Sequence, residues 1–227
     1  MVNSINLSTD RRRRTNRFDG GVQRRRNVEG DRPRGGVVNV AFVAFDGMTA
    51  LDFVGVYDPV TRIETMGFAS VEWDICARTE SVSTSGLTLD VDRIEPDLGT
   101  YDLVVVPGGT ATRTLREEDA FVDWLRSAGG ADLVASVCTG ALLLGAAGLL
   151  HGRDATTHPN ATSLLKAYAT VRDDRIVHDG PIVTAGGVAA ALDLGLYLVE
   201  VLEDERTRTA IAEQMDYPYG MGTEEGL

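Results

Sequence analysis

The sequence predicts one α/β domain, a three-layer sandwich in which a mainly parallel sheet has helices on both faces. Strand-like and helix-like stretches alternate from residue 37 to about residue 215 with no linker between them. Several of the strand-like stretches are almost continuously apolar, as in parallel strands buried on both sides. The chain has 227 residues, of which 43% are hydrophobic, which suits one packed domain. We expect this domain over 37–216, a disordered Arg-rich segment over 1–36 and a loose tail over 217–227.

The individual elements follow from local patterns. Strands are expected where β-branched and aromatic residues alternate or run together, and helices where apolar residues recur every three or four positions. Gly, Asp and Pro mark the turns between them. In chain order, we expect a strand over 37–45, a helix over 49–67, a strand over 71–78, a hairpin over 81–94, a strand over 101–106, a helix over 117–127, a strand over 133–137, a helix over 141–147, a short strand over 153–158, strand segments within 171–184, and a helix over 188–203 that continues to about 215.

The stretch S-V-C-T-G, Ser136 to Gly140, joins a buried strand to a helix. Small residues lie two positions before and two positions after Cys138, which is the spacing of a nucleophile elbow with cysteine in place of serine. The helix start offers unpaired N–H groups and a positive dipole end, so we expect a lowered thiol pKa. The alternative is a buried cysteine that only fills the core.

Three other features are expected at the same edge of the sheet. Gly108 and Gly109 follow a strand, where backbone N–H groups approach a ligand closely. Asp52 lies on the apolar side of its helix, either as part of a capping box with Thr49 or as a carboxylate aimed at the site. His158 ends a short strand and is either a structural or a catalytic residue. Ligands bind at the carboxyl ends of parallel strands, so these residues and Cys138 mark one candidate site.

Charge is unevenly distributed along the chain. Residues 1–36 carry ten Arg and four acidic residues, whereas residues 37–227 carry 12 basic and 30 acidic residues, a net charge of −18. The basic segment fits an arm that binds nucleic acid, a solvated tail, or a start codon assigned too far upstream. We favour the last two interpretations. The acidic body would repel nucleic acid, and its single lysine, Lys166, indicates a high-salt cytoplasm or a GC-rich genome.

Neither a membrane span nor a secretory signal is expected, because no apolar run is long enough and the N-terminus has no apolar core. The two cysteines, Cys76 and Cys138, cannot build a disulfide framework, which favours a reducing cytoplasm. The three histidines have no metal-ligand spacing, and the glycines after residue 107 match neither a dinucleotide fingerprint nor a P-loop. We therefore expect no metal, no cofactor and a small-molecule substrate.

Four stretches carry a resemblance to a known family: 41–55, 104–110, 136–158 and 182–196. Over roughly residues 38–216 the chain resembles the ThiJ/PfpI superfamily, the class I glutamine-amidotransferase-like proteins, and within it the isonitrile hydratase group. That resemblance implies a flavodoxin-like fold, a homodimer and a cysteine nucleophile. Val56-Tyr57 departs from the group, which usually has Pro after the preceding glycine.

The resemblance implies a cysteine-dependent hydratase that converts isonitriles to N-substituted formamides, with Cys138, Asp52 and Thr139 as the catalytic residues. Gly108, Gly109 and His158 would bind substrate or stabilise developing charge. PfpI-type peptidases are expected to have His directly after the nucleophile, where this chain has Thr139. The alternatives are glyoxalase-like chemistry on small electrophiles and a non-enzymatic redox sensor or ligand-binding protein.

Overall fold

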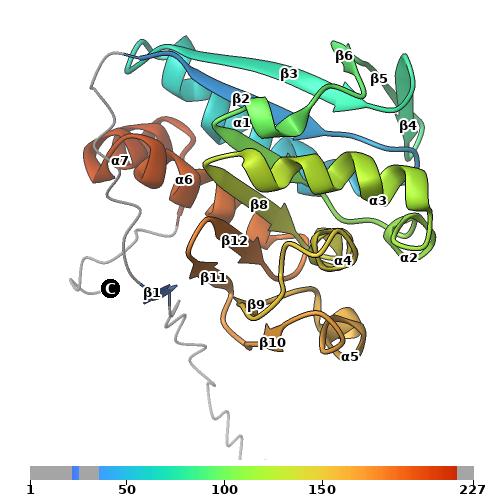
Figure 1. Ribbon diagram of the computed structural model, residues 1–227. Helices are drawn as coiled ribbons and strands as arrows, with labels where there is room; N and C mark the ends of the chain where they lie inside the picture. Colours follow the sequence, from blue (N-terminus) through green and yellow to red (C-terminus); the bar gives the residue numbers. More distant parts are fainter. Residues whose placement is uncertain (1–21, 26–35, 219–227) are drawn as a thin grey trace, which may run out of the picture.

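A computed structural model of the protein describes residues 22–25 and 36–218 (Figure 1). Within these residues the main sheet has eight strands in the order β1-β11-β12-β8-β7-β2-β3-β6. Neighbouring strands are parallel except for β11 and β12, which are antiparallel. Two small sheets pair β9 with β10 and β4 with β5. The strands are β1 (Val22–Arg25), β2 (Val38–Val43), β3 (Val71–Ala77), β4 (Ser81–Thr84), β5 (Leu87–Asp90), β6 (Arg93–Ile94), β7 (Leu103–Val106), β8 (Leu133–Val137), β9 (Asp154–Ala155), β10 (Thr170–Val171), β11 (Ile176–Asp179) and β12 (Ile182–Ala185).

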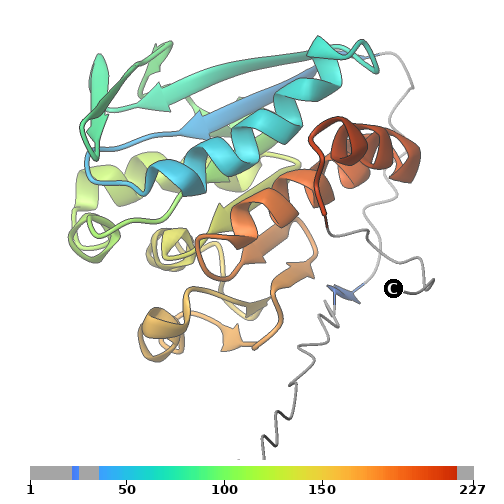
Figure 2. The ribbon, with the colours of Figure 1, turned by 180° about the vertical axis from the view of Figure 1, so that it is seen from behind.

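Helices cover both faces of this sheet, which confirms the predicted three-layer sandwich. Helices α3 and α4 lie on the face toward the viewer in Figure 1, and α1, α6 and α7 lie on the opposite face, seen in Figure 2. The helices are α1 (Ala50–Thr65), α2 (Thr112–Leu115), α3 (Asp119–Arg126), α4 (Gly140–Ala146), α5 (Thr162–Leu165), α6 (Ala190–Leu202) and α7 (Glu205–Gln214), with 3₁₀ turns η1 (Leu98–Thr100), η2 (Ser127–Gly130) and η3 (Pro159–Ala161).

The core lies on both sides of the central strands. Every residue of β7 and β8 is buried, which explains why both strands read as continuous apolar runs in the sequence. On the far face, α1 packs directly on α6. Gly55 permits this close packing, because a Cβ there would lie 2.7 Å from the Cβ of Ala191. The tight α1–α6 pair fixes the start of α1 against the end of the sheet.

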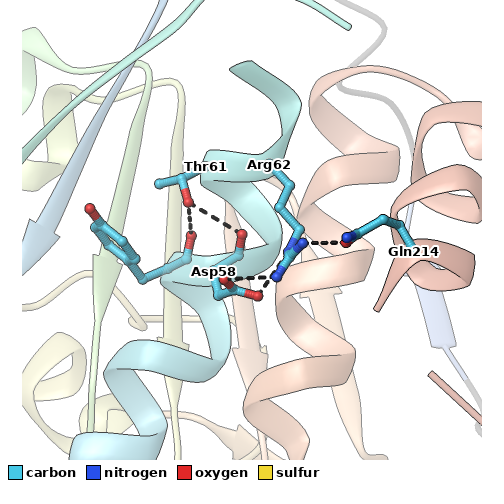
Figure 3. A network of polar contacts seen from close by, with 5 residues as sticks. Asp58, Thr61, Arg62 and Gln214 are labelled. Carbon is cyan, nitrogen blue, oxygen red and sulfur yellow. Dashed lines mark hydrogen bonds and ion pairs between the residues drawn. The ribbon is translucent and has the colours of Figure 1, made fainter. Parts of the chain in front are cut away.

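The expected long helix after residue 188 is instead two helices, so that prediction is wrong at its end. The chain leaves helical geometry at Glu203, and the Asp204 carboxylate accepts a hydrogen bond from the Thr207 N–H at 2.7 Å. An aspartate that caps a new helix competes with continuation of the old one. Figure 3 shows how α7 then docks on α1, where Arg62 bonds both the Asp58 carboxylate and the Gln214 side chain.

Both chain ends differ in part from the sequence expectation. Val22–Arg25 within the Arg-rich segment form β1, which pairs with the outer edge of β11. An uncovered strand edge presents free backbone groups to any extended segment, which accounts for this pairing. Tyr217, expected in a loose tail, packs against the core and bonds the Asp193 carboxylate through its hydroxyl. The remainder of the two predicted segments, 1–21, 26–35 and 219–227, lies outside the described residues.

Candidate active site

Cys138 occupies a tight turn between β8 and α4, as the sequence predicts for a nucleophile elbow. Its φ of 55° is left-handed, which is a strained conformation for a residue with a side chain. Two contacts hold the turn: the Cys138 N–H donates to the Ala185 carbonyl at 3.0 Å, and the Thr157 hydroxyl donates to the Cys138 carbonyl at 2.8 Å. Only 5% of the surface of Cys138 is exposed. The thiol is therefore rigidly placed just below the surface.

Two glycines let neighbouring segments approach the elbow. A Cβ at Gly140 would lie 2.5 Å from the Val106 carbonyl oxygen, so only glycine allows α4 to start against the end of β7. A Cβ at Gly108 would lie 2.6 Å from the Thr139 nitrogen and 2.7 Å from Oδ2 of Asp52. These distances are too short for a side chain, and Gly108 therefore leaves the space in which the candidate residues meet.

Asp52 lies in the first turn of α1 with its carboxylate fully buried. Its Oδ2 accepts a hydrogen bond from the Gly108 N–H at 3.0 Å. The Thr49 side chain makes no cap hydrogen bond, so no reciprocal capping box forms. Within the described part of the chain, Oδ1 is buried without a hydrogen-bond partner. Of the two interpretations of Asp52, the geometry favours the carboxylate aimed at the site.

Asp52 and Cys138 interact directly and shift each other's titration. Burial raises the pKa of the Asp52 carboxyl to about 6, against the opposing effects of the Gly108 N–H and the Cys138 thiol. Burial also raises the pKa of the Cys138 thiol to about 11, and the negative charge of Asp52 adds to this. The pair therefore holds one proton near neutral pH, on the thiol.

The expectation of a lowered thiol pKa is wrong. The N–H and hydroxyl of Thr139 do favour the thiolate, as a helix start should. However, burial and the adjacent carboxylate outweigh them. The helix is also short, because α4 covers only Gly140–Ala146. The sequence showed the helix start but not the depth at which the sulfur is buried.

Gly109 does not present its N–H to a ligand, contrary to the expected oxyanion role. That N–H donates to the Thr139 hydroxyl oxygen at 2.9 Å, and the hydroxyl donates to the Gly109 carbonyl at 3.0 Å. The Gly108 N–H is likewise used by Asp52. Both glycine amides thus position candidate side chains rather than a substrate.

His158 caps a 3₁₀ turn with its imidazole. It ends the segment after β9, which pairs with β10 outside the main sheet. Its Nδ1 accepts the Asn160 N–H at 3.1 Å and caps the η3 turn. Among the described residues no hydrogen bond joins its imidazole to Cys138 or Asp52. Its neighbour Thr157, which supports the elbow carbonyl, is the residue that sequence reasoning missed, since a threonine beside a histidine carries no distinctive signal.

The described residues hold neither a cluster suited to a metal ion nor a helix suited to a membrane. They contain no group of three or more His, Cys, Asp or Glu side chains placed to hold a metal ion. No helix in the described ranges has both the length and the apolar composition that crossing a membrane requires.

Together the fold and the pair of Asp52 and Cys138 define an α/β protein with cysteine at a nucleophile elbow and a buried acid beside it. The chain belongs to the DJ-1/PfpI family, whose model matches residues 38–201. This confirms the resemblance drawn from the motifs.

Curated relatives extend the comparison. Isonitrile hydratase of Pseudomonas putida is 35% identical over 182 residues, which cover 79% of this chain and 78% of that protein. Protein DJ-1alpha of Drosophila melanogaster is 34% identical over 126 residues, which cover 53% of this chain and 57% of that protein. The family thus includes both a named hydratase and DJ-1 proteins.

Solved structures show the same fold. A ThiJ/PfpI family protein from Pseudomonas syringae matches with a TM-score of 0.72 and 26% identity, over 92% of this chain and 87% of that one. DJ-1beta of Drosophila melanogaster matches with a TM-score of 0.71 and 22% identity, over 81% of this chain and all of that one. The second likeness concerns the fold alone.

Proposed function

We propose that this protein is a cysteine-dependent hydratase that converts isonitriles to N-substituted formamides. The observation that carries the proposal is the fully buried Asp52 carboxylate, which meets the Cys138 elbow at Gly108 and has one oxygen without a hydrogen-bond partner among the described residues. Such a pair can move a proton to and from a substrate while the sulfur forms a bond to it. The similarity to a named isonitrile hydratase over most of both chains supports the choice of substrate.

In the first step, Asp52 takes the thiol proton and delivers it to the terminal carbon of the isonitrile. The carbon lone pair accepts this proton, and the Cys138 thiolate forms a bond to the same carbon. One carbon–nitrogen π pair moves to the nitrogen, which gives a thioimidate, Cys–S–CH=N–R. The thiol's high pKa makes the free thiolate scarce, so we propose that proton transfer and sulfur attack are coupled.

In the second step, the Asp52 carboxylate removes a proton from water as its oxygen attacks the thioimidate carbon. Asp52 passes this proton to the nitrogen, which gives a tetrahedral adduct. The carbon–sulfur bond then breaks, and the hydroxyl proton returns through Asp52 to the sulfur. The product is the formamide R–NH–CHO, so isonitrile and water are consumed in equal amounts and the pair is restored. We propose that the Thr139 hydroxyl, which Gly109 holds in place, orients the water.

The raised thiol pKa counts against the redox-sensor alternative. Sensor cysteines are oxidised as thiolates and are therefore accessible and low in pKa. Cys138 is 5% exposed, and its pKa is raised to about 11. Glyoxalase-like chemistry uses the same pair on a carbonyl carbon, so a parallel assay with a 2-oxoaldehyde separates the two activities.

The test measures formamide formation from cyclohexyl isocyanide by the full chain in potassium chloride. We expect turnover by the wild type, none by Cys138→Ala, and a decrease of roughly 10²–10⁴-fold for Asp52→Asn, the range for loss of a general acid or base. The matched control is Cys76→Ala, because Cys76 is also a buried free cysteine but lies in β3. This control should retain turnover.

A second measurement follows the pH dependence of kcat/KM. The reactive form holds one proton on the pair, so kcat/KM should rise as pH increases through about 6, where Asp52 loses its proton. The Asp52→Asn variant should lack this rise. Wild-type turnover by the Asn variant would contradict the proposed mechanism. Failure of every isonitrile alongside turnover of a 2-oxoaldehyde would assign the glyoxalase-like activity instead.

A further inference from the structure

Within residues 22–25 and 36–218, no strand pairs with the outer edge of β3 at its beginning, and this stretch is called its open edge. Its outer partner, β6, pairs only with Cys76 and Ala77, near the end of β3 (Figure 1). The backbone N–H and carbonyl groups of successive residues point to alternate edges of a strand. Those of Ile75 point to the outer edge, because its N–H donates to the Asp92 carboxylate and its carbonyl accepts the Asp92 N–H. The backbone groups of Val71 and Trp73 therefore point to the outer edge too. The Val71 N–H is taken by the Glu64 carboxylate at 2.9 Å, and among the described residues nothing pairs with the N–H and carbonyl of Trp73.

A cavity of about 580 Å³ lies beside this edge. It is formed around the beginnings of β2 and β3, at the opposite end of the sheet from Cys138. Trp73 and Tyr101 contribute aromatic surface to its wall. Both rings are anchored, because the Trp73 indole N–H donates to the Tyr57 hydroxyl and the Tyr101 hydroxyl donates to Asp74. The aromatic surface is therefore preformed.

The same cavity has a negative lining. Its charged side chains are the carboxylates Glu64, Glu72 and Asp74 and a single guanidinium, Arg93. Arg93 is turned toward solvent, with 64% of its side chain exposed, and lies 3.5 Å from Asp74. Among the described residues no hydrogen bond or ion pair engages the Glu72 carboxylate. The cavity thus combines excess negative charge with flat aromatic surface, which is how proteins recognise organic cations.

We propose that the open edge of β3 binds an extended peptide segment that carries a basic side chain. The peptide backbone adds as a strand and bonds the free N–H and carbonyl of Trp73. Its lysine or arginine enters the cavity, where the charge faces Glu72 and Asp74 and the aliphatic stem lies on the Tyr101 ring, while alternate side chains of the added strand pack toward Trp73 on the other face of the sheet. The open strand edge favours a peptide over a free organic cation, because only a peptide uses both features.

The probe is a short synthetic peptide of alternating valine and arginine. Its binding is followed by the fluorescence of Trp73 in a Trp124→Phe variant, since the chain has two tryptophans. The anisotropy of the labelled peptide on the unsubstituted protein gives a second measurement that does not depend on this variant. We expect saturable binding by both methods, and weaker binding by a peptide in which proline replaces the valines, because proline lacks the N–H that strand pairing needs.

Two variants separate the cavity from the general acidity of the protein. Glu72→Gln and Glu80→Gln each remove one exposed carboxylate, but only Glu72 lines the cavity. We expect about tenfold weaker binding for Glu72→Gln, as for loss of a hydrogen bond to a charged group, and little change for Glu80→Gln. Equal weakening by the two variants would overturn the proposal in favour of unspecific charge attraction. Equal affinity of the proline peptide would overturn strand pairing and leave a site for organic cations.

Discussion

Replacement of Asp52 by asparagine should change how the stability of the protein depends on pH. The Asp52 side chain is fully buried, and burial raises its pKa from 3.8 to about 6. A carboxyl group whose pKa is raised on folding stabilises the folded state fully below its unfolded pKa and loses this contribution as pH rises through its folded pKa. The unfolding free energy of the wild type should therefore fall, relative to the asparagine variant, as pH increases from about 4 to about 7.

The size of this change follows from the two pKa values. A shift of one pKa unit corresponds to about 1.4 kcal/mol, so a carboxyl raised from 3.8 to about 6 loses at most about 3 kcal/mol when fully ionised. Roughly one third of that loss has already occurred by about pH 4.5. The difference in unfolding free energy between wild type and Asp52→Asn should therefore shift by about 2 kcal/mol between about pH 4.5 and about pH 7.5.

Urea unfolding at constant potassium chloride, at several pH values, measures this difference directly. Effects of the asparagine amide that do not vary with pH, such as altered hydrogen bonding, shift the difference in unfolding free energy equally at every pH. They therefore do not alter its change with pH. The matched control is Asp90→Asn, which removes an exposed carboxylate from β5. A wild-type-minus-variant difference that is the same at every pH would refute the conclusion that burial controls the titration of Asp52.

Four further predictions concern the site and the surface. Alkylation of Cys138 by iodoacetamide should be slow at neutral pH because the thiol pKa is about 11, and faster in Asp52→Asn; equal rates would contradict the coupling of the pair. Gly108→Ala places a Cβ 2.9 Å from that of Cys138, so urea unfolding should show a loss of about 1–3 kcal/mol together with reduced turnover, and unchanged values would refute the close packing. The net charge of −18 over residues 37–227 should make the melting temperature rise from low to molar potassium chloride, because salt screens the repulsion between like charges. An unchanged melting temperature would favour a GC-rich genome as the cause of the acidic composition. Leu51 and Val54, each 47% exposed on α1, favour a homodimer, and a monomer mass by light scattering would count against it.

The order of the elements could be predicted because the responsible patterns are local. Buried parallel strands are apolar throughout, as β7 and β8 are, and the spacing of Ser136, Cys138 and Gly140 marks a turn with small flanks. The end of α6 was missed because Asp204 is acceptable within a helix and at its start alike. Tertiary contacts with α1 make the capped, two-helix arrangement the stable one.

The candidate site was only partly predictable. Sequence placed Cys138, Asp52, Gly108 and Gly109 at one edge of the sheet, because parallel strands bring their carboxyl ends together. It gave the wrong partner for the Gly109 N–H, since a backbone amide bonds whichever acceptor the fold brings near it. His158 follows β9, which pairs with β10 in a small separate sheet, and the sequence showed neither this pairing nor the cap that its imidazole makes on η3.

Sequence alone determined the fold class, the elbow and the residue types that meet there, because each depends on periodicity, small residues or connectivity. Only the tertiary structure decided how these groups are ionised. The helix start and the Thr139 contacts favour a thiolate, whereas burial and the Asp52 charge disfavour it, and the balance depends on how much water the packed layers exclude. That exclusion is produced by residues far apart in the chain, so no local pattern contains it.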